Sequence, residues 1–177
     1  MTRGEIRIRA QEPEDLAAIA EICTGPTVRA ATLQVPVRSR AERRARLTPL
    51  ADGVHRLVAE VAGRVGGTLA LQVEANPRRR HGASLGMAVP DRCQGQGVGT
   101  ARLAAAIDLA DTWLGLRRRE LHVYPDNAAG IHLYETVGFV IEGVARDFAL
   151  RDGVFVDALV MARLRSEPGG DCAGQSR

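Results

Sequence analysis

The sequence predicts one mixed α/β domain, in which about four helices cover a mostly antiparallel sheet of six to seven strands. Strand and helix patterns follow one another in the order β-α-α-β-β-β-α-β-α-β-β. Hairpin patterns lie toward both ends, and a helix between strands 83–89 and 120–124 makes those two strands parallel neighbours. There is no internal repeat and no second core. We therefore expect a single domain over residues 1–165 and a disordered tail over residues 166–177.

The first 50 residues predict a strand followed by two helices. Residues 6–10 alternate isoleucine with arginine, which is typical of a half-buried strand. The helix over 12–24 has proline in its first turn and is stopped by a Gly-Pro pair. Residues 27–38 have no clear period and are expected to form a partly packed loop. Residues 39–47 open with the S-x-x-E spacing of a capping box, which predicts a short helix.

The remaining elements are predicted by alternation in strands and by a 3.6-residue period in helices. Two hairpins are expected, and Asp152-Gly153 is a typical hairpin turn. The predicted strands cover 55–61, 65–74, 83–89, 120–124, a short strand from Phe139 to Ile141, 144–150 and 154–164, and the predicted helices cover 100–114 and about ten residues between Asn127 and Gly138.

All 24 basic residues are arginine, and this composition excludes several classes of enzyme. A Walker A loop, a protein kinase and a pyridoxal enzyme each need a lysine. The net charge of +3 fits an anionic small ligand, whereas nucleic-acid binding would need a basic stripe interleaved with aromatic residues. The three cysteines have no metal spacing, and the N-terminus has neither a signal region nor an apolar run of membrane length. We expect a cytoplasmic protein with no membrane partner.

The glycine-rich turn that follows strand 83–89 is the first candidate for a binding site. Gly95, Gly97 and Gly99 alternate with Gln96 and Val98 just before a helix. Such a turn directs several N–H groups and the positive end of a helix dipole at one point, which suits phosphate. A tight strand-to-helix turn with nothing bound is the alternative interpretation. A dinucleotide fingerprint is excluded, because it needs glycine where Thr100 stands.

Two motifs resemble landmarks of the GCN5-related N-acetyltransferases. The segment Gln94–Gly99 is similar to their acetyl-CoA signature, Gln/Arg-x-x-Gly-x-Gly/Ala, and the segment Asn127–Phe139 is similar to their second landmark, with Tyr134 seven residues after Asn127 and a Gly-Phe pair behind it. The resemblance covers residues 4–165. Further segments, 32–36, 111–114, 138–143 and 149–157, are similar to a bacterial branch that acetylates free amino acids.

This resemblance implies a six- to seven-stranded fold with one splayed parallel strand pair and an acetyl-CoA-dependent N-acetyltransferase activity. The implied acceptor is the primary amine of a small molecule such as a free amino acid, which attacks directly in a ternary complex without a metal. The alternatives are a transferase acting on a protein N-terminus, a polyamine or an amine antibiotic, and a non-catalytic acyl-CoA sensor. A homodimer is compatible with a free sheet edge at 154–164.

The resemblance also places roles on particular residues. Tyr134 is the expected proton donor to the leaving thiolate, although a tyrosine on an amphipathic helix is commonly a core residue. The main chain of strand 83–89 is expected to pair with the pantetheine arm, and one of its N–H groups to stabilise the oxyanion. The expected acetyl-CoA-binding residues are Met87, Ala88, Val89, Gln94, Gly95, Gln96, Gly97, Val98, Gly99, Thr100, Asn127 and Tyr134.

The general base is left open by the sequence. Many members of the family place a glutamate on the strand before the glycine turn, and residues 81–89 contain none. His81, His122, Glu60, Glu74 or a water molecule are the candidates, and each of these side chains is also an ordinary surface or structural residue. A covalent thiol intermediate at Cys93 has no visible His/Asp partner, and His132 with Glu135 is too small a set for a metal site.

Overall fold

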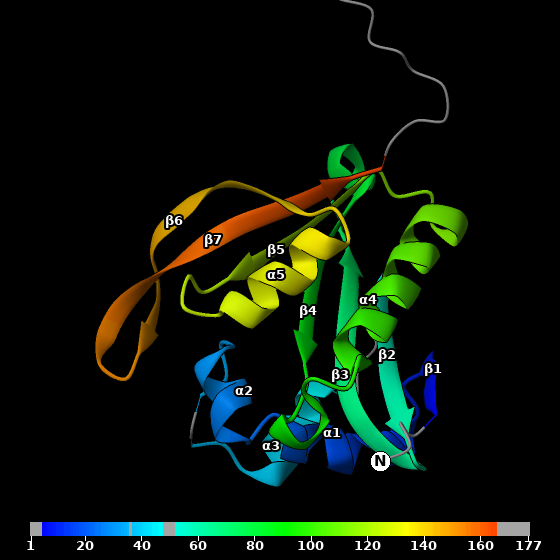
Figure 1. Ribbon diagram of the computed structural model, residues 1–177, viewed down its shortest axis with the longest axis vertical. Coiled ribbons are helices and arrows are strands. Elements are labelled where there is room, and N and C mark those ends of the chain that lie inside the picture. Colours follow the sequence, from blue (N-terminus) through cyan, green and yellow to red (C-terminus); the bar gives the residue numbers. More distant parts are fainter. Residues whose placement is uncertain (1–4, 36, 48–51, 166–177) are drawn as a thin grey trace, which may run out of the picture.

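The computed structural model describes residues 5–35, 37–47 and 52–165, which fold around one seven-stranded sheet (Figure 1). The strand order across the sheet is β1-β2-β3-β4-β5-β7-β6. The predicted tail over 166–177 lies outside the described residues, so the tail and the domain boundary stay predictions. The strands are β1 (Ile6–Ala10), β2 (Val54–Val61), β3 (Arg64–Val73), β4 (Gly82–Ala88), β5 (Arg118–Val123), β6 (Val140–Arg151) and β7 (Val154–Leu164).

The parallel pair in the middle of this sheet is short. β4 and β5 are paired only where Gly82, Ala83 and Ser84 face Arg118, Arg119 and Glu120. Beyond Ser84, β4 continues along β3 up to Ala88, while β5 continues along β7 up to Val123. The two strands therefore diverge toward their C-terminal ends. The predicted splayed pair, the strand number and the mixed α/β class are confirmed.

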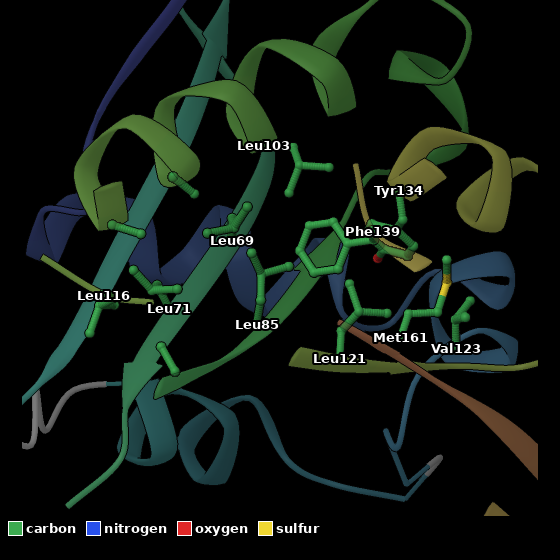
Figure 2. Close-up of a cluster of buried hydrophobic side chains, with 13 residues drawn as sticks. Leu69, Leu71, Leu85, Leu103, Leu116, Leu121, Val123, Tyr134, Phe139 and Met161 are labelled. Carbon is green, nitrogen blue, oxygen red and sulfur yellow. The ribbon is translucent and has the colours of Figure 1, made fainter. Parts of the chain in front are cut away.

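Helices cover both faces of the sheet. The α-helices are α1 (Leu16–Ile22), α2 (Pro26–Ala30), α3 (Arg40–Leu47), α4 (Val98–Asp108) and α5 (Ala128–Thr136), and a π-helical turn at Leu109–Trp113 continues α4. Leu103 and Ala106 of α4 pack with Leu69 and Leu71 of β3 in the main core (Figure 2). On the opposite face, Ile19 and Ile22 of α1 pack against Val58. The alternation of side chains along each strand supplies both layers.

Three local expectations were wrong. Residues 26–30 form helix α2 rather than a loop, because Pro26 starts a new helix where its missing N–H is not needed. The two strands expected at 139–141 and 144–150 are one strand, β6, whose register shifts absorb the irregular pattern. The free edge expected at 154–164 is also wrong, because β7 is paired with β5 and β6, and the edge strand is β6.

The capping box predicted before α3 is confirmed. Ser39 N–H donates to Glu42 Oε2 at 2.7 Å, and Glu42 N–H donates to Ser39 Oγ at 3.1 Å. Each side chain thus satisfies a backbone donor that the helix leaves without an acceptor.

Among the described residues, no helix combines the length and the apolar character that a membrane span requires.

Candidate functional site

The glycine-rich turn joins β4 to α4 through two left-handed residues. Gly95 has φ +69° and Gly97 has φ +84°, a region that side chains with a Cβ rarely adopt. The side chain of Gln94 supports the turn by donating to Val89 O at 3.3 Å and to Asp91 Oδ1 at 3.2 Å. Hydrogen bonds within the loop and its left-handed glycines therefore define the conformation of the turn.

The first turn of α4 presents free donors at the end of this loop. Gly97 is the N-cap residue, and its carbonyl accepts the first helical hydrogen bond from Ala101 N–H at 3.0 Å. The N–H groups of Val98, Gly99 and Thr100 precede this bond and have no acceptor within the helix. Three N–H groups at the positive end of a helix dipole form an arrangement that suits an anion such as a diphosphate.

Gly99 has a packing role that the sequence interpretation did not foresee. A Cβ at this position would lie 2.9 Å from Leu133 Cδ2 and 3.5 Å from Met87 Cε. The absence of a side chain thus lets α4 approach both α5 and β4 closely.

Asn127 caps α5, as predicted. Its Oδ1 accepts a hydrogen bond from Gly130 N–H at 3.0 Å, and a Cβ at Gly130 would collide with the Asn127 amide. This bond fixes the start of the helix that carries Tyr134.

A cavity of about 530 Å³ brings these segments together. It lies between α2, the end of β4, the glycine-rich turn and α5 (the elements are labelled in Figure 1). Gln96 does not line it, because its side chain is turned to donate to Arg92 O at 2.6 Å. The other predicted acetyl-CoA-binding residues all line the cavity: Met87, Ala88, Val89, Gln94, Gly95, Gly97, Val98, Gly99, Thr100, Asn127 and Tyr134.

A second cavity, of about 250 Å³, adjoins the first one and is lined by residues of both β4 and β5. Gly86 and His122 line it from these two strands, and Phe148 lines it from β6. Tyr134 and Met87 line both cavities, so the two spaces meet at these residues. Ala31 and Thr32 also line both cavities, so the two spaces are adjacent over this whole region.

Tyr134 is a buried phenol at this meeting point. It belongs to the main core, and its ring centroid lies 5.8 Å from that of Phe139 (both are labelled in Figure 2). Burial raises the pKa of Tyr134 to about 12, and the positive charge of Arg102 opposes this rise. The hydroxyl is therefore neutral across the physiological range and able to donate a proton or a hydrogen bond. Tyr134 is thus a core residue, and its role as a proton donor stays a prediction.

Of the four candidate bases, His122 lines a cavity and the other three lie elsewhere. Its ring stacks on Phe148 with centroids 4.6 Å apart and planes 13° apart. Glu60 accepts a hydrogen bond from Arg9 Nε at 3.0 Å, and Glu74 lies 4.0 Å from Arg79. His81 lies just before Gly82, at the end of β4 where the parallel pair is closed.

Cys93, His132 and Glu135 acquire no chemical partners in the described residues. Cys93 is buried with Ala59 and Val98 and also lines the larger cavity. His132 and Glu135 are exposed on α5. Among the described residues, no three His, Cys, Asp or Glu side chains come together as a metal site would require.

Two parts of the site were missed by the sequence interpretation. Thr27, Val28, Ala31 and Thr32 line the larger cavity from α2 and the residues after it, and the absence of a clear period hid them. Arg102 is fully buried behind the site, and burial lowers its pKa to about 10. Its position four residues after Val98 and four before Ala106 was a usable signal, because that spacing places an arginine on the apolar face of α4.

The fold and the two joined cavities define a two-substrate transferase. The family model described as "Acetyltransferase (GNAT) family" matches residues 9–139. The L-amino acid N-acetyltransferase AaaT of Escherichia coli (strain K12) is 42% identical over 162 residues, which cover 92% of this chain and 99% of that protein. The chain therefore belongs to the GNAT family of acetyltransferases, which confirms the family and the enzyme class that the two motifs predicted.

Solved structures agree with this assignment. An acetyltransferase of the GNAT family from Streptococcus pneumoniae has a TM-score of 0.77 and 28% identity, covering 92% of this chain and all of that one. The spermidine N-acetyltransferase from Vibrio cholerae, solved in complex with CoA and spermine, has a TM-score of 0.78 and 26% identity over 90% of this chain and 95% of that chain.

Proposed function

We propose that this protein transfers the acetyl group of acetyl-CoA to the primary amine of a free amino acid by direct attack in a ternary complex. The observation that carries the proposal is the meeting of the two cavities at Tyr134 and Met87, beside the open end of β4. The larger space suits the extended donor, and the smaller suits a compact acceptor. The amino-acid acceptor of the 42% identical relative supports the acceptor class.

The acetyl-CoA site in this proposal is the larger cavity. The free N–H groups of Val98, Gly99 and Thr100 bind the diphosphate, where hydrogen bonds to charged oxygens are strong. The main chain of Met87, Ala88 and Val89 pairs with the pantetheine arm along the side of β4 that β5 leaves open. Gln94, Gly95, Gly97 and Asn127 form the surrounding wall. The backbone N–H of Gln96 stays a predicted contact, since its side chain faces away from the cavity.

The proposed reaction has two steps, which are attack of the amine on the thioester and departure of the CoA thiolate. The amine nitrogen forms a bond to the thioester carbonyl carbon, and the π electrons move onto oxygen, where a backbone N–H of Met87 or Val89 stabilises the charge. The oxyanion then collapses and the C–S bond breaks. A hydrogen bond from Tyr134 stabilises the departing sulfur, which takes its proton from solvent, and the amine loses its extra proton to a base or to water. The products are an amide and CoA.

The raised pKa of Tyr134 defines how it acts. A thiol has a pKa of about 8.5, so complete proton transfer from a phenol near 12 to the thiolate is uphill. A hydrogen bond from the hydroxyl to the sulfur stabilises the developing charge without completing that transfer. Tyr134 is therefore proposed as a hydrogen-bond donor that shares its proton with the departing sulfur.

His122 is the proposed base, acting directly or through one water molecule. It lines the acceptor cavity on the strand opposite Gly86, where a Cβ would meet nothing within 4 Å. The space left by Gly86 gives the acceptor room beside the imidazole. Stacking on Phe148 holds the ring in this position.

The charges around the acceptor cavity favour an amino acid over a polyamine. No Asp or Glu is among the described residues that line it, and a polyamine carries several positive charges that need carboxylates. At its edge, Arg151 lies 4.9 Å from the ring centroid of Tyr124, which lines the cavity. This guanidinium forms an ion pair with Asp126 at 2.7 Å, so the edge of the cavity holds a cation and a carboxylate that compensate each other. In this proposal the enzyme acts in the cytoplasm, and a homodimer stays a prediction, although the edge at 154–164 that suggested it is paired with β6.

A panel of acceptors tests this function. We expect release of free CoA thiol with free amino acids, and at least tenfold lower kcat/KM with spermidine, an aminoglycoside and an N-terminal peptide, because these lack a compact amine with a neighbouring carboxylate. The corresponding amino-acid amides serve as the matched control. Faster turnover of a polyamine or a peptide would contradict the proposed acceptor and identify that amine as the preferred one. Tight acetyl-CoA binding with no turnover of any amine would show a non-catalytic sensor.

Replacing Gly97 with alanine tests the donor site. A Cβ at φ +84° strains the turn from which the free N–H groups of α4 begin, so we expect acetyl-CoA affinity to fall at least tenfold. Gly63→Ala is the matched control, since Gly63 has φ +74° in the turn between β2 and β3, away from both cavities. Calorimetry should show normal affinity for Gly63→Ala. Equal affinity in the two variants would contradict the assignment of the turn.

Replacing Tyr134 with phenylalanine tests the proton donor. We expect kcat to fall by up to about 100-fold while acetyl-CoA affinity is kept, because the ring still packs against Phe139. Thr136→Val, which removes an exposed hydroxyl from the same helix away from both cavities, is the control. In the wild-type pH profile, ionisation of Tyr134 should cause no loss of kcat below about pH 11, because its pKa is raised to about 12. An unchanged kcat in Tyr134→Phe at every pH would remove this residue from the mechanism.

Replacing His122 with glutamine tests the base. The amide keeps the size of the side chain and loses its basicity, so kcat/KM for the acceptor should fall at least 100-fold at neutral pH. The loss should become smaller as the pH rises, because a larger fraction of the free amine is then already neutral. His132→Gln on the exposed face of α5 is the control. A loss that is the same at every pH would assign His122 to substrate binding instead.

A further inference from the structure

Arg102 is a buried cation that the chemistry described above does not use. Its side chain is 0% exposed on the face of α4 that packs against the sheet. One guanidinium nitrogen, Nη1, donates to Ala88 O at 3.1 Å. Within the described part of the chain, Nε and Nη2 have no hydrogen-bond partner, and no carboxylate forms an ion pair with this guanidinium. The charge is thus held by a backbone carbonyl alone.

The neighbouring strand leaves space for this side chain. A Cβ at Gly67 of β3 would collide with Arg102 Nη1 and lie 2.8 Å from its Cζ. An apolar side chain of similar length would avoid the desolvation of an unpaired charge, which is unfavourable in a protein interior. Packing alone therefore gives no reason for an arginine at this position.

The hydrogen bond to Ala88 fixes a peptide group in the wall of the larger cavity. Ala88 and Val89 both line this cavity. The described peptide bonds are all trans, so the Ala88 carbonyl and the Val89 N–H point in opposite directions from one planar unit. Arg102 holds the carbonyl on the side of Gly67 and β3. The Val89 N–H is consequently directed away from β3, toward the open side of the splay.

We propose that Arg102 is a positioning residue for acetyl transfer, whose guanidinium orients and polarises the Ala88–Val89 peptide so that the Val89 N–H binds the thioester oxygen. This inference rests on the proposed acetyl-CoA site. A hydrogen bond to the carbonyl, here from a cation, strengthens the N–H of the same amide as a donor. The oxyanion carries more charge than the ground-state carbonyl. The stronger hydrogen bond from the Val89 N–H therefore raises kcat more than it raises the affinity for acetyl-CoA.

Three variants test this role kinetically. Arg102→Met removes the charge and the donor at similar length, Arg102→Lys keeps both, and Arg64→Met, at the exposed start of β3, is the control. We expect kcat to fall about tenfold in Arg102→Met with the Kd for acetyl-CoA within threefold of wild type, because the Val89 donor is weakened and not removed. Thermal stability should be unchanged or higher. Arg102→Lys should recover most of kcat.

The Val89 amide provides a readout that needs no acceptor. Acetyl-CoA and CoA differ by the acetyl carbonyl, so the difference between the Val89 amide proton shifts in the two complexes reports the proposed hydrogen bond. We expect a downfield difference in the wild type and less than half of it in Arg102→Met. If Arg102→Met does not fold, Arg102→Gln, which keeps a donor without charge, should show an intermediate difference.

The outcomes separate this inference from the proposed function. A wild-type protein that binds no acetyl-CoA by calorimetry would refute the proposed function itself. A wild type that binds and turns over acetyl-CoA, beside a folded Arg102→Met with the same kcat and the same Val89 shift difference, would refute only the role of Arg102. Arg102→Lys as slow as Arg102→Met would contradict polarisation by the cation.

Discussion

The separation of β4 from β5 is the constraint on which the rest of the structure depends. Parallel pairing is limited to three residues of each strand, because each strand then follows its antiparallel partner. A sheet with continuous pairing would have no unpaired main chain in its centre. Here the divergence leaves one side of β4 free exactly where the glycine-rich turn begins. Met87 of this free end of β4 lines both cavities, and so does Tyr134.

The parts of the site that the sequence predicted are those encoded by short local signals. The glycines of the turn can be recognised in the sequence because two local requirements select glycine. Gly97 has a left-handed backbone, and Gly99 lies close to side chains of α5 and β4. The capping role of Asn127 can be predicted from sequence because it depends on one side chain and a backbone N–H three residues later. The same locality explains why the strands and the crossover helix were predicted with nearly correct limits. The resemblance then connected two local motifs into one site.

The parts that were missed depend on contacts between distant segments. Helix α2 has a single turn with one buried residue, Val28, so no period could reveal it, although it lines the larger cavity. Which of the four candidate bases lies beside the splay depends on the sheet order, and His122 of β5 lines the second cavity there. The continuity of β6 depends on bulges that break the alternation. Such features are set by tertiary structure and override local pattern.

The two fully buried arginines of the described core differ in whether a carboxylate compensates their charge. Arg119 forms an ion pair with Asp111 at 2.7 Å and donates to Leu116 O, so its charge is compensated where it joins β5 to the turn after α4. Arg102 has the same burial and has a carbonyl as its only described partner. Removing a partner from Arg119 would leave a buried charge unpaired, at a cost of about 3–5 kcal/mol. Arg102 is already an unpaired buried charge, and it lies beside the Ala88–Val89 peptide in the wall of the larger cavity. A fold selected for stability alone would place an apolar side chain there, whereas an enzyme that must stabilise negative charge in the transition state gains from a fixed positive charge behind its donor.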